Sequence, residues 1–272
     1  MSLNIDLERI VAIAEKAGRA IMTIYARDFD VAEKEDKSPL TEADMAAHRI
    51  IVEELQRLEP RLPILSEESA DIPWEERSRW LRYWLVDPLD GTREFIKRNG
   101  EFTVNIALVE SGRATCGVVH VPVSETSYYG CIGKGAWKKE KDGPPQRIRV
   151  ARQRRHPLRV AGSRSHAGDS LKRFLARVGP HEIMSMGSSL KLCLVAEGDA
   201  DIYPRLGPTS EWDTAAAQAV VEAAGGHVTD LQGEPLRYNR KDSLLNPHFL
   251  VFGDENEDWT AYLQPNPAST EP

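Results

Sequence analysis

The stretch WLVDPLDGTREF, which runs from Trp84 to Phe95, joins an apolar segment directly to two carboxylates that stand three residues apart. Its first residues, Trp84 to Val86, have the composition of a buried strand that is about to end. A buried carboxylate is costly unless a cation or several hydrogen-bond donors compensate its charge. The stretch therefore indicates either an ordinary polar turn or a site where a cation binds.

The details of this turn favour the second interpretation. If the strand ends at Asp87 and the proline after it turns the chain, Asp90 can return beside Asp87. The carbonyl of Leu89 is then free of the sheet, and Gly91 lets other groups approach the backbone closely. Thr92 can begin a helix and offer its hydroxyl and backbone N–H groups to an anion. Carboxylate and carbonyl oxygens suit Mg2+, so this turn predicts a place for cations and a phosphate together.

Composition limits the class of protein. The chain has 272 residues, of which 41% are hydrophobic and 28% charged, with a net charge of -7. These values are typical of a globular protein and predict no broad basic surface for a nucleic acid polymer. We expect no transmembrane segment, because no apolar run approaches the roughly 20 residues that a membrane-spanning helix needs. The charged N-terminus is unlike a signal peptide, so we expect a cytoplasmic location, with peripheral association at the inner membrane as an alternative.

Cysteine usage supports the same location. The chain has three cysteines, Cys116, Cys131 and Cys193, and none of them forms a C-x-x-C pair. This odd number argues against a disulfide framework and against a thiolate zinc site. We therefore expect three small buried apolar side chains in a reducing compartment.

The pattern of elements changes along the chain. Amphipathic helices are predicted from Leu7 and from Thr41, and three strand-like segments after the opening stretch predict an antiparallel meander. After about residue 155, strands and helices alternate. We predict an α+β N-terminal domain at 1–154 that carries most metal ligands. An α/β C-terminal domain at 155–263 with nucleotide-binding elements and a disordered tail at 264–272 complete the division.

Five carboxylates fall at the ends of predicted elements: Asp44, Glu67, Asp87, Asp90 and Asp213. Each has a structural interpretation of its own. Asp44 follows a threonine by three residues, as in a capping box, and Asp213 directly precedes a helix that it could cap. Glu67 could lie in a solvated loop. Taken singly, the structural interpretation is preferred in each case, but together the five residues favour a site for divalent cations.

In the residues and the order of four motifs, the chain resembles the inositol monophosphatase superfamily of lithium-sensitive, magnesium-dependent phosphatases. The motif D-P-[IL]-D-G-[ST] stands at 87–92, W-D-x-A-A at 212–216, the G/S-E-E segment at 66–68 and T-x-x-D at 41–44. Within the superfamily, the stretch 84–110 and the segments 162–167, 187–198 and 201–216 most resemble the bacterial 3′(2′),5′-bisphosphate nucleotidases. The resemblance covers about residues 5 to 255. It implies the layered αβαβα sugar-phosphatase fold, of the α+β class, with the metal site between the two parts.

The resemblance also implies roles for the carboxylates. One Mg2+ would lie on Glu67, Asp87 and the Leu89 carbonyl, and a second on Asp87, Asp90 and Asp213. A third, weaker ion would share Glu67. A metal-activated water would attack the phosphorus in line, with no covalent phosphoenzyme. Thr92, with Asp44 behind it, would orient and help deprotonate this water, and Glu67 would assist.

Substrate contacts are expected from both parts of the chain. In the second part, predicted strand ends and a helix start carry polar and cationic residues that could hold the phosphate that is not cleaved. The full set of expected substrate-binding residues is Glu67, Leu89, Asp90, Gly91, Thr92, Ser163, Ser165, His166, Ser188, Ser189, Lys191, Arg205 and Asp213.

The expected activity is removal of the 3′-phosphate from adenosine 3′,5′-bisphosphate, which yields AMP and phosphate. The resemblance places this reaction in sulfur assimilation and adds 3′-phosphoadenylyl sulfate as a second substrate. An inositol monophosphatase or a fructose-1,6-bisphosphatase of the same superfamily is the alternative enzyme. A non-catalytic sensor that binds nucleotide or metal is the alternative from another class. The expected partner is a small nucleotide bisphosphate, and a monomer is preferred over a homodimer.

Overall fold

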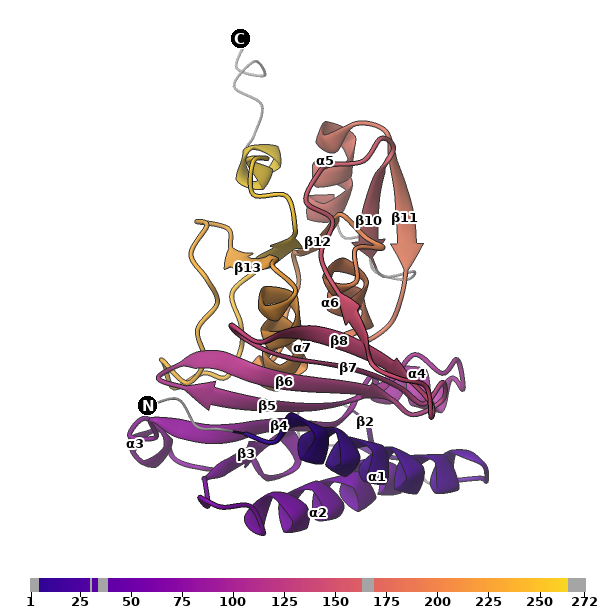
Figure 1. The fold of residues 1–272 in the computed structure, drawn as a ribbon, viewed down its shortest axis with the longest axis vertical. Helices are drawn as coiled ribbons and strands as arrows, with labels where there is room; N and C mark the ends of the chain where they lie inside the picture. Colours follow the sequence, from indigo (N-terminus) through magenta and orange to yellow (C-terminus); the bar gives the residue numbers. More distant parts are fainter. Residues whose placement is uncertain (1–4, 30, 34–38, 163–168, 264–272) are drawn as a thin grey trace.

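The computed structural model describes residues 5–29, 31–33, 39–162 and 169–263. Helices and sheets alternate in five layers, helix–sheet–helix–sheet–helix (Figure 1). The expected layered αβαβα fold is confirmed. The division into domains at residue 154 stays a prediction, and the predicted tail at 264–272 lies outside the described residues.

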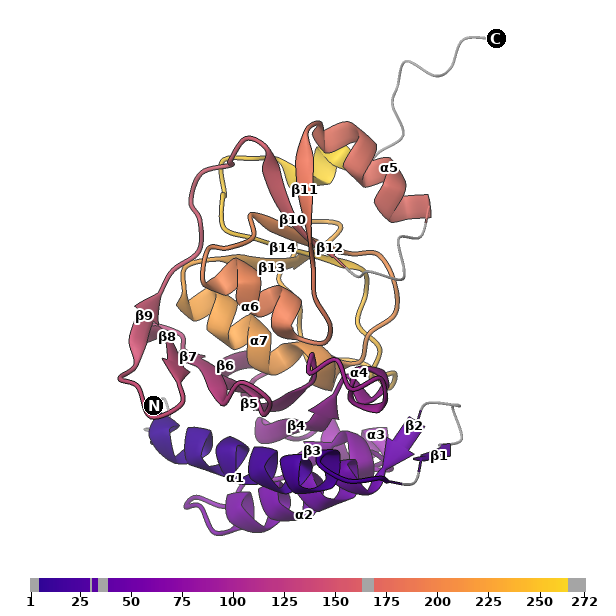
Figure 2. The same cartoon turned by 90° about the vertical axis from the view of Figure 1, so that its right-hand side faces the viewer.

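Two antiparallel-packed helices form the outer layer at the N-terminal end. They are α1 (Leu7–Tyr25) and α2 (Glu42–Gln56), and both were predicted from their apolar periodicity. Their buried faces cover one face of the larger sheet (Figure 2). A short antiparallel ribbon, β1 (Val31–Glu33) and β2 (Pro39–Thr41), precedes α2.

The larger sheet has its seven strands in sequence order. Only its first pair, β3 with β4, is parallel, and the remaining neighbours are antiparallel, as the predicted meander requires. Three short helices, η1 (Glu67–Ser69), α3 (Trp74–Arg77) and α4 (Thr92–Ile96), lie at its ends. The strands are β3 (Ile64–Ser66), β4 (Arg82–Asp90), β5 (Thr103–Glu110), β6 (Arg113–Val121), β7 (Thr126–Cys131), β8 (Gly135–Glu140) and β9 (Gln146–Ile148).

A second, five-stranded sheet lies beyond two central helices, α6 (Leu190–Ala196) and α7 (Glu211–Ala223). These helices fill the core between the two sheets, while α5 (Asp169–Val178) and η2 (Trp259–Tyr262) cover the outer face (Figure 2). In spatial order its strands are β11 (His181–Ser185), β10 (Leu158–Gly162), β12 (Ile202–Arg205), β14 (Phe249–Phe252) and β13 (His227–Asp230).

The expectation of three unpaired cysteines is wrong. Cys116 on β6 and Cys131 on β7 form a disulfide, and only Cys193 is a free, buried thiol. The two paired residues stand directly opposite each other in the antiparallel register, with their Cα atoms 4.1 Å apart. Counting cysteines cannot detect this pairing, because the pairing depends on strand register, not on sequence spacing.

Among the described residues, none of the helices combines the length and the apolar character needed to cross a membrane.

Candidate active site

A bulge in β4 places both carboxylates of the opening stretch on one face of the sheet. Asp87 pairs with Asn105 and Asp90 with Thr103, so three steps along β4 match two steps along β5. In a regular strand, residues three apart point to opposite faces. The extra residue of a bulge shifts this alternation by one, so Asp87 and Asp90 face the same side. The expectation that the strand ends at Asp87 is therefore wrong, because β4 continues to Asp90.

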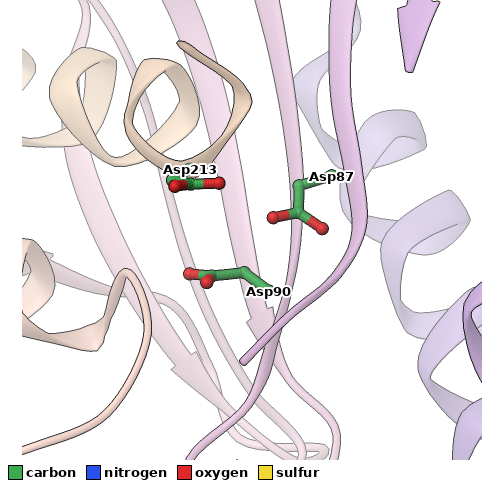
Figure 3. Close-up of side chains that lie close together, drawn as sticks. All are labelled: Asp87, Asp90 and Asp213. Carbon is green, nitrogen blue, oxygen red and sulfur yellow. The ribbon is translucent and has the colours of Figure 1, made fainter. Parts of the chain in front are cut away.

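The N-terminus of α7 brings a third carboxylate to this place. Ser210 caps the helix, and its backbone N–H donates to Asp213 at 2.9 Å in a capping box. Asp213 is thus the third residue of the helix and not its cap. Its carboxylate approaches those of Asp87 and Asp90, with one oxygen of each within 4.8 Å of the others (Figure 3).

Burial makes this cluster unfavourable without a cation. The pKa of Asp87 is raised well above its usual value by burial and then by repulsion from Glu67, Asp90 and Asp213. Burial raises the pKa of Asp90 to about 6, although Lys191 and a backbone N–H oppose the change. The pKa of Asp213 is likewise raised, first by burial and then by Asp90. Clustered carboxylates in a low-dielectric place are the donor set that hard divalent cations prefer, so the three aspartates could hold a metal ion.

Glu67 reaches the cluster from the neighbouring strand. Because β3 is parallel to β4 and the last pair between them is Ser66 with Val86, the next residues, Glu67 and Asp87, follow side by side, Glu67 in η1 and Asp87 still in β4. The influence of Glu67 on the pKa of Asp87 reflects this proximity. In the part of the chain that the structure describes, the trio with ligand atoms within 4.8 Å does not include Glu67, so its role as a ligand stays a prediction.

Asp44 makes both of the contacts that the sequence suggested, and its catalytic role stays a prediction. Its Oδ2 accepts hydrogen bonds from the backbone N–H and the hydroxyl of Thr41, at 2.8 and 2.6 Å, in the predicted capping box. Its Oδ1 accepts the hydroxyl of Thr92 at 3.3 Å. The cap therefore holds this buried carboxylate in place beneath the threonine of the D-P-L-D-G-T motif.

The turn between β4 and α4 requires glycine. Gly91 has φ +91°, and a Cβ atom there would lie 3.2 Å from the Glu101 carbonyl and 3.3 Å from Ser188 Cβ. The carbonyl of Leu89 faces the Thr92 hydroxyl at 3.4 Å. The turn thus brings the first part of the chain into contact with the loop that precedes α6.

A cavity of about 770 Å³ opens beside the carboxylate cluster. Asp90 and Asp213 line one part of it, and three cationic side chains line it as well: Arg93, Lys191 and Arg205. A cavity that combines a cation-binding carboxylate cluster with separate cations suits a ligand that carries more than one anionic group.

Two of the residues that line this cavity each have a buried polar atom without a hydrogen-bond partner among the described residues. These atoms are Nε of Arg205 and the hydroxyl oxygen of Ser188. Arg205 also donates through Nη2 to the Pro208 carbonyl at 2.7 Å, which orients the guanidinium. Unsatisfied buried polar groups are costly, so a small side-chain rotation that brings either group to a polar ligand in the cavity would be favourable.

Lys191 is more deeply buried than its expected role suggested. It donates to the carbonyls of Met186 and Ser188, at 3.2 and 2.7 Å, and its ammonium lies over the Tyr203 ring. Burial lowers the pKa of Lys191 to about 8. These hydrogen bonds hold the loop before α6, and the contact of Lys191 with substrate stays a prediction.

The structure brings the predicted residues of the first part together with those near α6 and α7. Ser188, Ser189, Lys191 and Arg205 all line the cavity. Ser163, Ser165 and His166 lie outside the described residues. Sequence reasoning missed Thr103 and Asn105, which lie opposite the two aspartates. Their polar side chains, alternating with apolar residues in a strand-like segment, are the signal that could have revealed them.

Comparison with known proteins agrees with this geometry. A model described as the inositol monophosphatase family matches residues 6–264. The chain belongs to the inositol monophosphatase family. The 3'(2'),5'-bisphosphate nucleotidase CysQ of Salmonella typhimurium is 55% identical over 247 residues, which cover 90% of this chain and 98% of that protein. The protein of the same name from Escherichia coli K12 is 54% identical over the same length and with the same coverage.

Solved structures give the same result. The crystal structure of CysQ from Bacteroides thetaiotaomicron has a TM-score of 0.80 and 42% identity, and the match covers 92% of this chain and 97% of that one. An IMPase from Thermotoga maritima has a TM-score of 0.75 and 27% identity, covering 94% and 96%. The expected family and its nucleotidase branch are confirmed.

Proposed function

We propose that this protein is a Mg2+-dependent 3′(2′),5′-bisphosphate nucleotidase that removes the 3′-phosphate of adenosine 3′,5′-bisphosphate. The products are AMP and phosphate, and 3′-phosphoadenylyl sulfate is a second substrate of the same class. One observation carries the proposal: two members of the carboxylate cluster, Asp90 and Asp213, line the same cavity as the cationic Arg205. A substrate with two phosphate groups matches this arrangement, and the relatives named for such an activity align over nearly their whole length.

The carboxylates provide the place for the cations. We propose two Mg2+ ions, and a weaker third, on Asp87, Asp90, Asp213, Glu67 and the Leu89 carbonyl. When bound, Mg2+ supplies positive charge that offsets the charge of the phosphate and lowers the pKa of a coordinated water. The raised pKa values of the three aspartates support this role, because a bound cation would compensate the buried negative charge and reduce the repulsion between the carboxylates.

Thr92 and Asp44 orient the attacking water. The Thr92 hydroxyl donates its proton to Asp44 Oδ1, so its lone pairs remain to accept a hydrogen bond from water. Asp44 is held by its capping bonds, so the threonine has one preferred direction. Backbone N–H groups at Gly91 and Thr92 would bind the phosphate that is cleaved.

Arg205 and Ser188 bind the phosphate that is not cleaved. Both residues line the cavity, and each has a buried polar group without a partner among the described residues that a small rotation would turn to a phosphate oxygen. Lys191 adds positive charge close by, since its ammonium reaches the carbonyl of Ser188. This division assigns the reaction centre to the aspartates and nucleotide selection to the second part of the chain.

The first experiment is a phosphate-release assay with Mg2+ on adenosine 3′,5′-bisphosphate and inositol 1-phosphate in parallel, with and without Li+. We expect a strong preference for the nucleotide, inhibition by Li+, and loss of release from both substrates in Asp90→Asn. A preference for the inositol ester would overturn the assignment of Arg205 and Ser188. Release that survives in Asp90→Asn would overturn the metal site.

A further inference from the structure

The backbone N–H of Ser189 donates a hydrogen bond to one oxygen of the Asp90 carboxylate. The distance from Ser189 N to Asp90 Oδ2 is 2.6 Å, short enough for a charge-assisted hydrogen bond. Ser189 directly precedes α6 and Asp90 ends β4, so this bond joins the two parts of the chain. We propose that Ser189, anchored through its side chain to β5, is a positioning residue that orients Asp90 for metal binding.

The hydroxyl of Ser189 is anchored to two residues of β5. Its oxygen lies 3.0 Å from Asn105 Oδ1 and 2.8 Å from the Thr103 hydroxyl. The amide oxygen can only accept, so the one proton of Ser189 goes to Asn105 and Thr103 donates to Ser189. These three residues are 0–2% exposed. Each bond is therefore costly to leave unmade.

The same amide also reaches the aspartate directly. With Oδ1 of Asn105 turned to Ser189, its Nδ2 lies 3.5 Å from Asp90 Oδ2. The strand that pairs with β4 thus supports Asp90 in two ways, through a long direct contact and through the serine. Because Thr103 and Asn105 are also the register partners of Asp90 and Asp87, the support follows from the pairing of β4 with β5.

The loop before Ser189 is held from its other side. Lys191 donates to the Ser188 carbonyl at 2.7 Å, and Ser188 itself has φ +41°. A Cβ atom on Gly187 would lie 2.8 Å from the Glu101 carbonyl, so this backbone packs tightly against the turn after α4. The Ser189 amide is therefore presented to Asp90 from a constrained loop.

With Oδ2 held, the Asp90 carboxylate has a set orientation relative to Asp87 and Asp213. Loss of the serine hydroxyl leaves Asn105 without its donor and Thr103 without its acceptor. The backbone N–H of residue 189 is then no longer anchored to β5, and the Asp90 carboxylate that it binds can rotate. Removal of groups that orient metal ligands typically lowers metal affinity by about 10–100-fold. We expect a loss of this size in Ser189→Ala and in Asn105→Ala.

The test is a calorimetric titration of the purified full chain with Mg2+ alone. Ser127→Ala is the matched control, because Ser127 is equally buried and bonds His120 Nδ1 at 2.9 Å on β7, away from the aspartates. The inference rests on the proposed metal role of Asp90, so Asp90→Asn is titrated too. No nucleotide is present, so the result does not depend on which substrate the enzyme prefers.

We expect weaker Mg2+ binding in Ser189→Ala and Asn105→Ala, unchanged binding in Ser127→Ala, and recovery in Ser189→Thr, which keeps the hydroxyl. Wild-type affinity in a folded Ser189→Ala would overturn the inference, as would an equal loss in Ser127→Ala. If Ser189→Ala does not fold, Thr103→Val decides instead, because it removes the donor to the Ser189 hydroxyl and leaves the contact of Asn105 with Asp90 in place. Wild-type affinity in Asp90→Asn would overturn the proposed metal site instead.

Discussion

Gly117 lets α7 pack closely against β6, and this packing sets the position of Asp213. Substitution of Gly117 by alanine should therefore disturb the active site. This residue lies on β6 beneath α7, and a Cβ atom there would lie 2.1 Å from the Ala216 carbonyl oxygen. Real Cβ atoms essentially never approach closer than 3.0 Å, so the helix backbone has to move by about 0.9 Å or more. The obstacle is backbone, so no side chain can rotate away to relieve the clash.

The displacement should affect both stability and chemistry. Overpacking of this kind costs about 1–3 kcal/mol, which a protein of ordinary stability tolerates. Ala216 is one helical turn from Asp213, so the movement also shifts one of the three clustered carboxylates. A misplacement of about 1 Å at a reaction centre can lower the rate about 100-fold. We therefore expect Gly117→Ala to fold, with weaker Mg2+ activation and a much lower kcat.

Gly130 offers a matched control. It is the register partner of Gly117, and a Cβ atom there would lie 2.9 Å from Ala223 Cβ, at the opposite end of α7. That end is roughly 15 Å along the helix from Asp213. In denaturant unfolding and Mg2+-dependent phosphate release, Gly130→Ala should lose stability but keep its metal dependence. Equal catalytic losses in the two variants, or normal kcat in Gly117→Ala, would refute the reasoning.

Three further predictions concern single groups. Thr92→Val should lower kcat by about 10²–10⁴-fold while Thr92→Ser retains activity, because only the hydroxyl contacts Asp44; equal kcat in the two variants would contradict this. Burial lowers the pKa of His120 to about 4 from an ordinary 6.5, so its neutral form stabilises the fold above pH 6.5. About 3 kcal/mol of unfolding free energy should be lost as the pH falls from 6.5 to 4, and His120→Gln should remove this part of the pH dependence. Reduction of the Cys116–Cys131 disulfide, whose residues are 15 apart in sequence, should cost about 3 kcal/mol, and an unchanged unfolding midpoint with reductant would argue against it.

Periodicity and local chemistry made much of the fold predictable. The apolar positions of α1 repeat at helical spacing, and the capping box that begins α2 can be recognised from Thr41 and Asp44 alone. The strands of the meander alternate with turn residues. These features depend on neighbours in the sequence, so the sequence itself contains the information.

Features that depend on strand register were less accessible. The pairing of Cys116 with Cys131 requires β6 and β7 in one particular alignment. The bonds of Ser189 to Asn105 and Thr103 require the loop before α6 to meet β5, a contact between residues more than 80 positions apart. The burial of Lys191 depends on how the loop before α6 folds, because two carbonyls of that loop accept hydrogen bonds from its ammonium. Sequence spacing alone does not determine such distances.

The spacing of Asp87 and Asp90 shows how a register feature can still leave a trace in the sequence. A spacing of two on a regular strand would also place both carboxylates on one face, but the carbonyl between them would remain in the ladder. A spacing of three requires a bulge, which interrupts the hydrogen bonds between the two strands. Proline suits this position because Pro88 has no N–H that would be left without a partner there. The bulge leaves Leu89 outside the register: its N–H turns to Asp87 Oδ1 at 3.0 Å and its carbonyl to the Thr92 hydroxyl. The proline and the odd spacing together therefore provide two carboxylates on one face of the sheet and a carbonyl outside the ladder, which are oxygen donors of the kind that a hard cation prefers.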